Sequence, residues 1–132
     1  MKRAACMMLA ILFALFSNEL VVSAELWTVS ELKETISDVD HELVLLDVRT
    51  QSEYNDGHIQ DAINIPHDQL LKEPQLVSAY KDSQMVVFCR SGVRAGKVIE
   101  MLEGLGFKEI IDIDGDMLAW NEAGHSVEIN NE

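Results

Sequence analysis

The chain has 132 residues, 48% of them apolar, which suits one packed domain and excludes disordered or collagen-like classes. It carries 23 Asp and Glu against 10 Lys and Arg, a formal net charge of -13 at pH 7. This balance argues against nucleic acid as a partner and against anionic membrane surfaces, because both attract clustered cations. If the substrate is a small anion, its site must gather local positive charge within an acidic protein.

Residues 1–24 have the pattern of a cleavable signal peptide. After a short basic start, residues 4–16 form an apolar run that is too short to span a bilayer comfortably. The small residues at 22–24 then offer a cleavage site. We therefore expect an exported, periplasmic domain of residues 25–132 with no stable membrane association after cleavage; an uncleaved anchor is the alternative. Cys89 would be its only cysteine, so no internal disulfide could form.

After residue 25, short apolar runs alternate with helical patterns, which is typical of βα units and a parallel sheet. Strands are expected at residues 26–29, 43–48, 62–65, 85–88 and 110–113. One helix is expected to follow Ser30, and further helices or single helical turns are expected at residues 52–54, 74–80, 95–105 and 117–121. The sequence therefore predicts an α/β fold with a mostly parallel five-stranded sheet flanked by helices on both faces.

Two helix ends carry recognisable capping patterns. Ser30 is expected to cap the first helix, with Glu31 and Glu34 in its first turn, where negative charge suits the helix dipole. Gly106 and Phe107 follow the expected helix at 95–105 and fit a left-handed C-cap with an apolar contact.

One loop has the composition of a reactive-cysteine site. It joins an expected buried strand to an expected helix, where free N–H groups and the helix dipole favour anions. Two arginines add positive charge, and Gly92 permits close backbone approach. Together these features favour a thiolate at the first position. The loop, here called the Cys89 loop, consists of Cys89, Arg90, Ser91, Gly92, Val93 and Arg94.

At this loop the sequence resembles the rhodanese (thiosulfate sulfurtransferase) family in its single-domain exported form, and the resemblance covers residues 26–128. The Cys89 loop resembles the six-residue active-site loop of that family. The other matching segments are Asp47-Val48-Arg49 with Glu53, Gly57-His58-Ile59, Ala62-Ile63-Asn64-Ile65-Pro66, and Gly115, Trp120, Gly124 and Val127. The resemblance implies a rhodanese-like domain spanning residues 25–132.

Three positions depart from the family pattern. Asp61 and Asp116 stand where glycines are usual, and Ser126 stands where a proline is usual. We expect none of them to touch the Cys89 loop, so these departures are expected to alter local turns and not the chemistry.

The resemblance implies a double-displacement sulfurtransferase. Cys89 would take the outer sulfur of thiosulfate or of a persulfide donor, hold it as a persulfide among the N–H groups of residues 90–94, and pass it to a thiol or to cyanide. Arg90 and Arg94 would bind the anionic donor. No cofactor is implied.

Four further residues are candidates for a supporting role. Asp47 is read mainly as a buried carboxylate tied to backbone or arginine, with support of the Cys89 loop as the alternative. Arg49 and Glu53 are four residues apart and are expected to pair. His58 is read mainly as a histidine that fixes a turn, with proton transfer as the alternative.

No metal site is expected. The four histidines are scattered, and the segment at 112–116 resembles a calcium loop only faintly, because its glycine comes early and the closing glutamate is missing.

Two alternatives to a sulfurtransferase are weighed. A Cys-based phosphatase or arsenate reductase needs one more loop residue before its arginine, whereas position 95 here is alanine. A persulfide carrier that serves one partner without free turnover would have the same residues, and only an assay separates it from an enzyme.

Overall fold

Five parallel strands form one sheet in the order β1-β5-β4-β2-β3. The computed structural model describes residues 23–131, so most of the predicted signal peptide lies outside the described residues. In chain order the strands are β1 (Glu25–Trp27), β2 (Val44–Asp47), β3 (Ile63–Asn64), β4 (Gln84–Phe88) and β5 (Glu109–Ile113). The sheet thus confirms the predicted five-stranded parallel arrangement.

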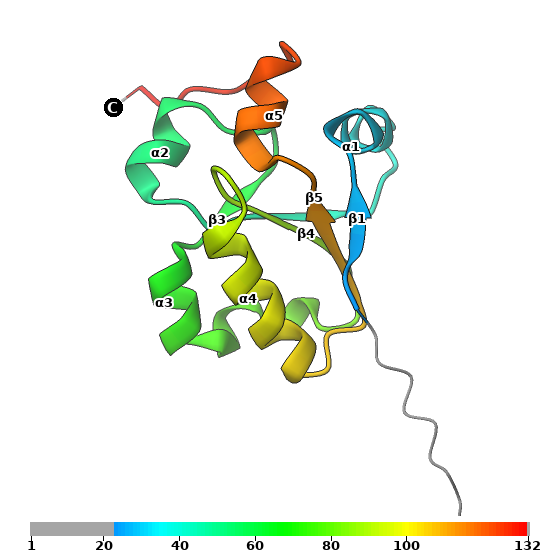
Figure 1. Cartoon of the computed structure of the whole chain (residues 1–132), viewed down its shortest axis with the longest axis vertical. Helices are drawn as coiled ribbons and strands as arrows, with labels where there is room; N and C mark the ends of the chain where they lie inside the picture. Colours follow the sequence, from blue (N-terminus) through cyan, green and yellow to red (C-terminus); the bar gives the residue numbers. More distant parts are fainter. Residues whose placement is uncertain (1–22, 132) are drawn as a thin grey trace, which may run out of the picture.

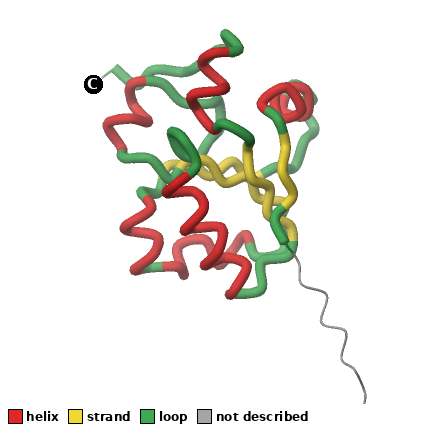
Figure 2. Tube along the Cα trace, viewed as in Figure 1, coloured by secondary structure: helices red, strands yellow, loops and turns green. Residues whose placement is uncertain are grey.

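Helices cover both faces of this sheet (Figures 1 and 2). They are α1 (Val29–Ile36), α2 (Gln51–Asp56), α3 (His67–Lys72), α4 (Val93–Gly104) and α5 (Asp116–Glu122), with a 3₁₀ helix, η1 (Pro74–Tyr80), after α3. The 3₁₀ helix lies where a short helix was predicted. The α3 helix was not predicted, because Pro66 was taken only as the end of a strand.

Two apolar clusters hold the layers together. On one face, Leu70 of α3, Val77 of η1 and Val98 of α4 pack on residues of β2 and β4. On the other face, Leu32 of α1 and Trp120 of α5 pack on the opposite side of the same strands. The alternation of strand residues between the two clusters follows from the two-residue period of a strand.

The first helix begins two residues earlier than predicted. Its N-cap is Thr28 and not Ser30, because the Thr28 hydroxyl accepts the N–H of Glu31 while the Glu31 carboxylate accepts the N–H of Thr28. This reciprocal pair is a capping box. The strand before it accordingly ends at Trp27, two residues short of its predicted end.

The predicted end of α4 is confirmed. Gly106 is left-handed (φ 82°), its N–H donates to the carbonyl of Glu103, and the N–H of Phe107 donates to the carbonyl of Leu102. These two bonds are those of a Schellman motif, and Phe107 is buried in the same cluster as Leu102.

All five strands point the same way, so their carboxyl ends meet at one edge of the sheet, the edge where ligands bind in open α/β folds. β4 is the central strand, and Cys89 follows it directly. Within residues 23–131, no helix combines the length and the apolar character that a bilayer crossing requires.

Candidate active site

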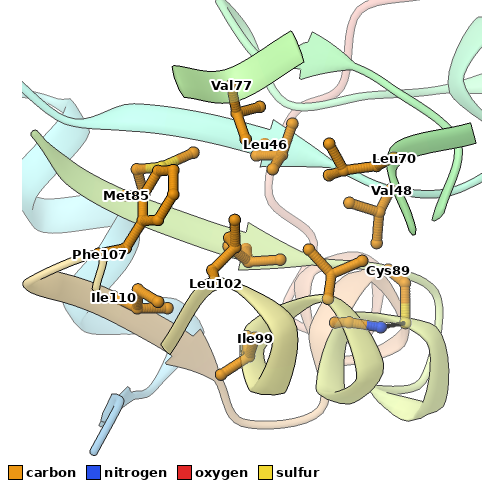
Figure 3. Packing of buried hydrophobic residues seen from close by; sticks show 13 residues of the cluster. Leu46, Val48, Leu70, Val77, Met85, Cys89, Ile99, Leu102, Phe107 and Ile110 are labelled. Atoms are coloured by element: carbon orange, nitrogen blue, oxygen red, sulfur yellow. Dashed lines mark hydrogen bonds between the residues drawn. The ribbon is translucent and has the colours of Figure 1, made fainter. Parts of the chain in front are cut away.

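Cys89 lies at the centre of the carboxyl edge, between the last residue of β4 and the start of α4. Its side chain is buried, with 1% of its surface exposed, and it forms one end of an apolar cluster near Val48 and Leu70 (Figure 3). Such burial places the sulfur beside the backbone of its own loop and largely out of bulk solvent.

Two backbone amides point at the sulfur. The N–H of Gly92 donates to Cys89 Sγ over 3.1 Å, and the N–H of Ala95 donates over 3.4 Å. Within the described part of the chain, the amides of Arg90, Ser91, Val93 and Arg94 have no hydrogen-bond acceptor. The loop therefore offers both direct donors to the sulfur and spare donors at a helix N-terminus.

Gly92 makes this geometry possible. It has φ 111° and ψ -16°, a left-handed conformation that residues with a Cβ rarely adopt. A Cβ at this position would also lie 3.1 Å from Asp116 Oδ2. The chain therefore needs glycine here both for the turn and for the close approach.

The remaining side chains of the loop face outward. Arg90 and Ser91 are exposed, and Val93 is 69% exposed. Among residues 23–131, no carboxylate forms an ion pair with Arg90. Its guanidinium therefore adds a positive charge that is not compensated at the rim of the site, as an anion-binding role requires.

Arg94 is engaged differently. Its two terminal nitrogens donate to both carboxylate oxygens of Glu53, at 2.6 and 3.0 Å. The hydrogen bond from Arg94 lowers the pKa of Glu53 to about 2, and the same bond raises the pKa of Arg94. The proposed binding of an anionic donor by Arg94 stays a prediction, and any such donor must share this guanidinium with Glu53.

The predicted pairing of the Arg49 and Glu53 side chains is wrong. The Arg49 guanidinium instead donates to the Asp47 carboxylate, from Nε to Oδ1 at 3.0 Å and from one terminal nitrogen to Oδ2 at 2.6 Å. Both members are buried, 6% and 0% exposed respectively, which agrees with the structural reading of Asp47. The Arg49 guanidinium also donates to the carbonyls of Glu53 and Gly57, so the pair ties α2 to the end of β2.

His58 has a structural environment. It is 3% exposed, its ring stacks on Tyr54 at 3.8 Å, and its Nδ1 lies 2.9 Å from the carbonyl of Tyr54. Its backbone N–H donates to the carbonyl of Glu128. These contacts fix the turn after α2 against the C-terminal segment, as the turn-fixing reading expects.

Asp116 was missed as a site residue, and the expectation that none of the three departures touches the Cys89 loop is wrong for this position. Its Oδ1 accepts the backbone N–H of Cys89 at 2.8 Å, and it is only 3% exposed. Burial raises its pKa to about 6. Asp116 is 27 residues away in sequence, and nothing local in the sequence indicates this contact.

The match to a family model covers most of the chain: residues 28–123 match the rhodanese-like domain. The chain belongs to the rhodanese-like domain family. The rhodanese-like fold predicted from the motifs is thereby confirmed.

Within residues 23–131, no three His, Cys, Asp or Glu side chains group as metal ligands.

Solved structures agree with this assignment. A rhodanese-like domain protein from Staphylococcus aureus is 31% identical with a TM-score of 0.69, and 81% of this chain matches 99% of that one. A rhodanese-related protein from Thermoplasma volcanium is 30% identical with a TM-score of 0.68, and 79% of this chain matches 97% of that one. About four fifths of this chain therefore correspond to nearly the whole of each of these two structures.

Among curated proteins, the tRNA uridine(34) hydroxylase of Cronobacter sakazakii is 32% identical over 85 residues, which are 61% of this chain and 24% of that protein. The match thus spans about a quarter of the length of that relative.

Proposed function

We propose that this rhodanese-like protein is a sulfurtransferase that moves a sulfane sulfur through a persulfide on Cys89. The donor is thiosulfate or another persulfide, and the acceptor is a thiol or cyanide. The observation that carries the proposal is the convergence of two amide donors on Cys89 Sγ, with further unpaired amides beside them at the start of α4. This arrangement supports a negatively charged sulfur more than a neutral thiol.

The reaction has two displacements. The Cys89 thiolate attacks the outer sulfur of thiosulfate, a new S–S bond forms, and sulfite leaves with the electron pair of the old one. The acceptor thiolate or cyanide then attacks the outer sulfur of the persulfide, and the Cys89 thiolate leaves with its electron pair. The amides around Sγ stabilise the sulfur anion at both stages, which is catalysis by an activated nucleophile and a preorganised anion site.

A second candidate is a dedicated sulfur carrier that loads Cys89 but releases the sulfur only to one protein partner. The exposed Val93 and Arg90 at the rim of the site support it, because they offer an apolar and a charged contact to a docking protein. The hydroxylase relative is matched over only 24% of its length, so its activity does not define the substrate of this chain.

One assay separates these candidates. The purified protein is mixed with thiosulfate and cyanide, thiocyanate formation is followed, and the intact mass is measured after thiosulfate alone. Turnover together with a one-sulfur mass gain, both lost in Cys89→Ser, is expected for the enzyme. Loading without turnover would favour the carrier, and absence of both would contradict the sulfurtransferase proposal.

We further propose that the protein works in the periplasm after removal of residues 1–24. The basic start, the apolar run and the small residues at 22–24 support export. The mass of the protein recovered from a periplasmic extract tests this proposal. A mature chain beginning at Glu25 is expected, and recovery of the full-length chain from the cytosol would contradict export.

A further inference from the structure

An unpaired acidic side chain lies directly against the reactive cysteine. The Asp116 carboxylate accepts the backbone N–H of Cys89 at 2.8 Å, and Oδ2 lies so near Gly92 that a Cβ there would be only 3.1 Å from it. Asp116 thus contacts both the first residue of the Cys89 loop and the glycine whose amide donates to Sγ.

The charges around Asp116 leave its carboxylate uncompensated. No Lys or Arg within residues 23–131 forms an ion pair with Asp116. From β5 and the turn after it, Asp112 and Asp114 add further negative charge, and both raise the pKa of Asp116. In the first turn of α4, the guanidinium of Arg94 is already paired with Glu53.

Cys89 itself is the remaining titratable group that faces Asp116. The hydrogen bond from the Cys89 backbone N–H favours the carboxylate form, but burial outweighs it and raises the pKa of Asp116 to about 6. Asp116 therefore changes charge in the mildly acidic range, close to the sulfur, inside a site that is shielded from water.

The backbone at Asp116 explains why a carboxylate can stand there. Asp116 has φ 50°, in the left-handed region where Asp and Asn are the best tolerated residues after glycine. The turn therefore accepts Asp, Asn or Gly with similar backbone geometry, and the choice among them decides whether the site holds a charge.

We infer that Asp116 is a specificity-determining residue that selects reagents at Cys89 by their charge. In its ionised form it repels dianionic donors such as thiosulfate, and it leaves uncharged reagents at the same thiolate comparatively unaffected. Neutralisation of Asp116 opens the site to anions. The inference rests on the proposed function for its biological meaning, because it states which sulfur donors the protein prefers.

A pair of alkylating reagents measures this selection without any turnover. Iodoacetamide is neutral and iodoacetate is an anion of similar size, and both react with the Cys89 thiolate. Both rate constants are proportional to the fraction of Cys89 present as thiolate, so this fraction cancels in their ratio. The ratio therefore measures only how the charge of the reagent affects its reaction at the site. The full-length protein is compared with Asp116→Asn, in which the amide oxygen can still accept the Cys89 N–H, and with Asp114→Asn, which removes an exposed charge two residues away. Alkylation is read by mass on the peptide that contains Cys89, because the full-length chain also has Cys6.

At about pH 8 the iodoacetamide-to-iodoacetate ratio is expected to fall roughly tenfold in Asp116→Asn and to change less than about twofold in Asp114→Asn. In the unmodified protein the ratio is expected to fall toward the Asp116→Asn value as the pH drops through about 6, a readout that needs no variant to fold. A ratio that is independent of pH, or equal in the protein and in Asp116→Asn, would overturn the inference.

Sulfur loading separates this inference from the proposed function. The rate of the one-sulfur mass gain from thiosulfate is expected to rise in Asp116→Asn at about pH 8, by a factor similar to that seen for iodoacetate. If the alkylation ratio shifts as described but no variant gains sulfur from thiosulfate, the charge selection holds and the sulfurtransferase proposal fails. If every variant loads sulfur and the alkylation ratio does not shift, the sulfurtransferase proposal holds and the charge selection by Asp116 fails.

Discussion

Glu53 and Arg94 form a two-point ion pair that joins α2 to the first turn of α4, with N–O distances of 2.6 and 3.0 Å. Glu53 also closes the capping box of α2 with Thr50, so one carboxylate serves both the helix start and the arginine. Arg49 reaches the carbonyl of Glu53 from the other side and holds Asp47 at the end of β2. A continuous series of hydrogen bonds thus runs from the end of β2 through α2 to the first turn of α4.

This series of contacts predicts that part of the role of Arg94 is to neutralise the negative charge of Glu53. Arg94→Gln leaves the carboxylate of Glu53 unpaired near the site, and the KM for thiosulfate is expected to rise about tenfold. The double variant Glu53→Gln/Arg94→Gln removes that carboxylate and is expected to recover a large part of the loss. Steady-state thiocyanate formation at low ionic strength measures both effects.

Lys97→Gln is the matched control for this cycle, since it removes an exposed positive charge from the same helix. It is expected to change the KM for thiosulfate by less than about twofold. A double variant as impaired as Arg94→Gln alone would show that Arg94 acts directly on the donor and that its charge balance with Glu53 is irrelevant.

The same ion pair predicts a stability effect in acid. The folded pKa of Glu53, about 2, lies below its ordinary value of 4.5, so the pair stabilises the fold above 4.5 and loses this contribution as the pH falls toward 2. Glu53→Gln keeps a side chain that can close the capping box. Since both partners are partly exposed, the variant is expected to lose only about 1 kcal/mol of unfolding free energy at neutral pH.

Urea unfolding at several pH values checks this prediction. The difference between the protein and Glu53→Gln is expected to be constant from neutral pH down to 4.5 and to shrink below it. A difference that stays the same into strong acid would mean that the ion pair contributes nothing to the fold.

Substitution by alanine is expected to have opposite effects at two glycines near the start of α4. Gly92→Ala places a Cβ on a backbone with φ 111° and 3.1 Å from Asp116 Oδ2, so it is expected to cost about 1–2 kcal/mol and to reduce sulfur loading at Cys89. Gly96→Ala meets nothing within 4 Å in the interior of the helix and is expected to stabilise by about 0.5–1 kcal/mol.

Thermal unfolding and the one-sulfur mass gain from thiosulfate measure both glycine variants. If Gly92→Ala loads sulfur at the normal rate, the left-handed turn is not what holds the amides on the sulfur. If Gly96→Ala is as damaging as Gly92→Ala, the effect belongs to the helix as a whole.

The fold was predictable because each buried strand is a compact apolar run followed by a helical pattern. The errors occurred where two local patterns competed. Thr28 and Glu31 have the spacing of a capping box, but Val29 extended the apparent strand and moved the expected cap to Ser30. The α3 helix follows Pro66 and is short, with Leu70 its only buried residue, so it offers little periodicity to detect.

The site was predictable only where it is local in sequence. The Cys89 loop is a continuous segment, so its chemistry can be read from neighbouring residues. The pairing of Arg49 was misassigned because Asp47, two residues back, competes with Glu53 for the same guanidinium and is more deeply buried. Asp116 reaches Cys89 only because β4 and β5 are adjacent in the sheet, and that register cannot be read from residues around either position.

Asp116 also predicts that the fold becomes less stable as the pH rises through the mildly acidic range. Its folded pKa, about 6, lies above its ordinary value of 3.8, so between these values the folded state holds a proton that the unfolded state has released. The stabilisation from protonated Asp116 is complete below 3.8 and is lost as the pH rises to about 6. Asp116→Asn removes this titration, so its stability relative to the unmodified protein is expected to grow across that range by on the order of 2 kcal/mol.

Urea unfolding from about pH 4 to about pH 7 measures this difference in stability, with Asp114→Asn as the exposed control. If the stability curves of the unmodified protein and of Asp116→Asn run parallel across this range, Asp116 titrates as an ordinary surface carboxyl.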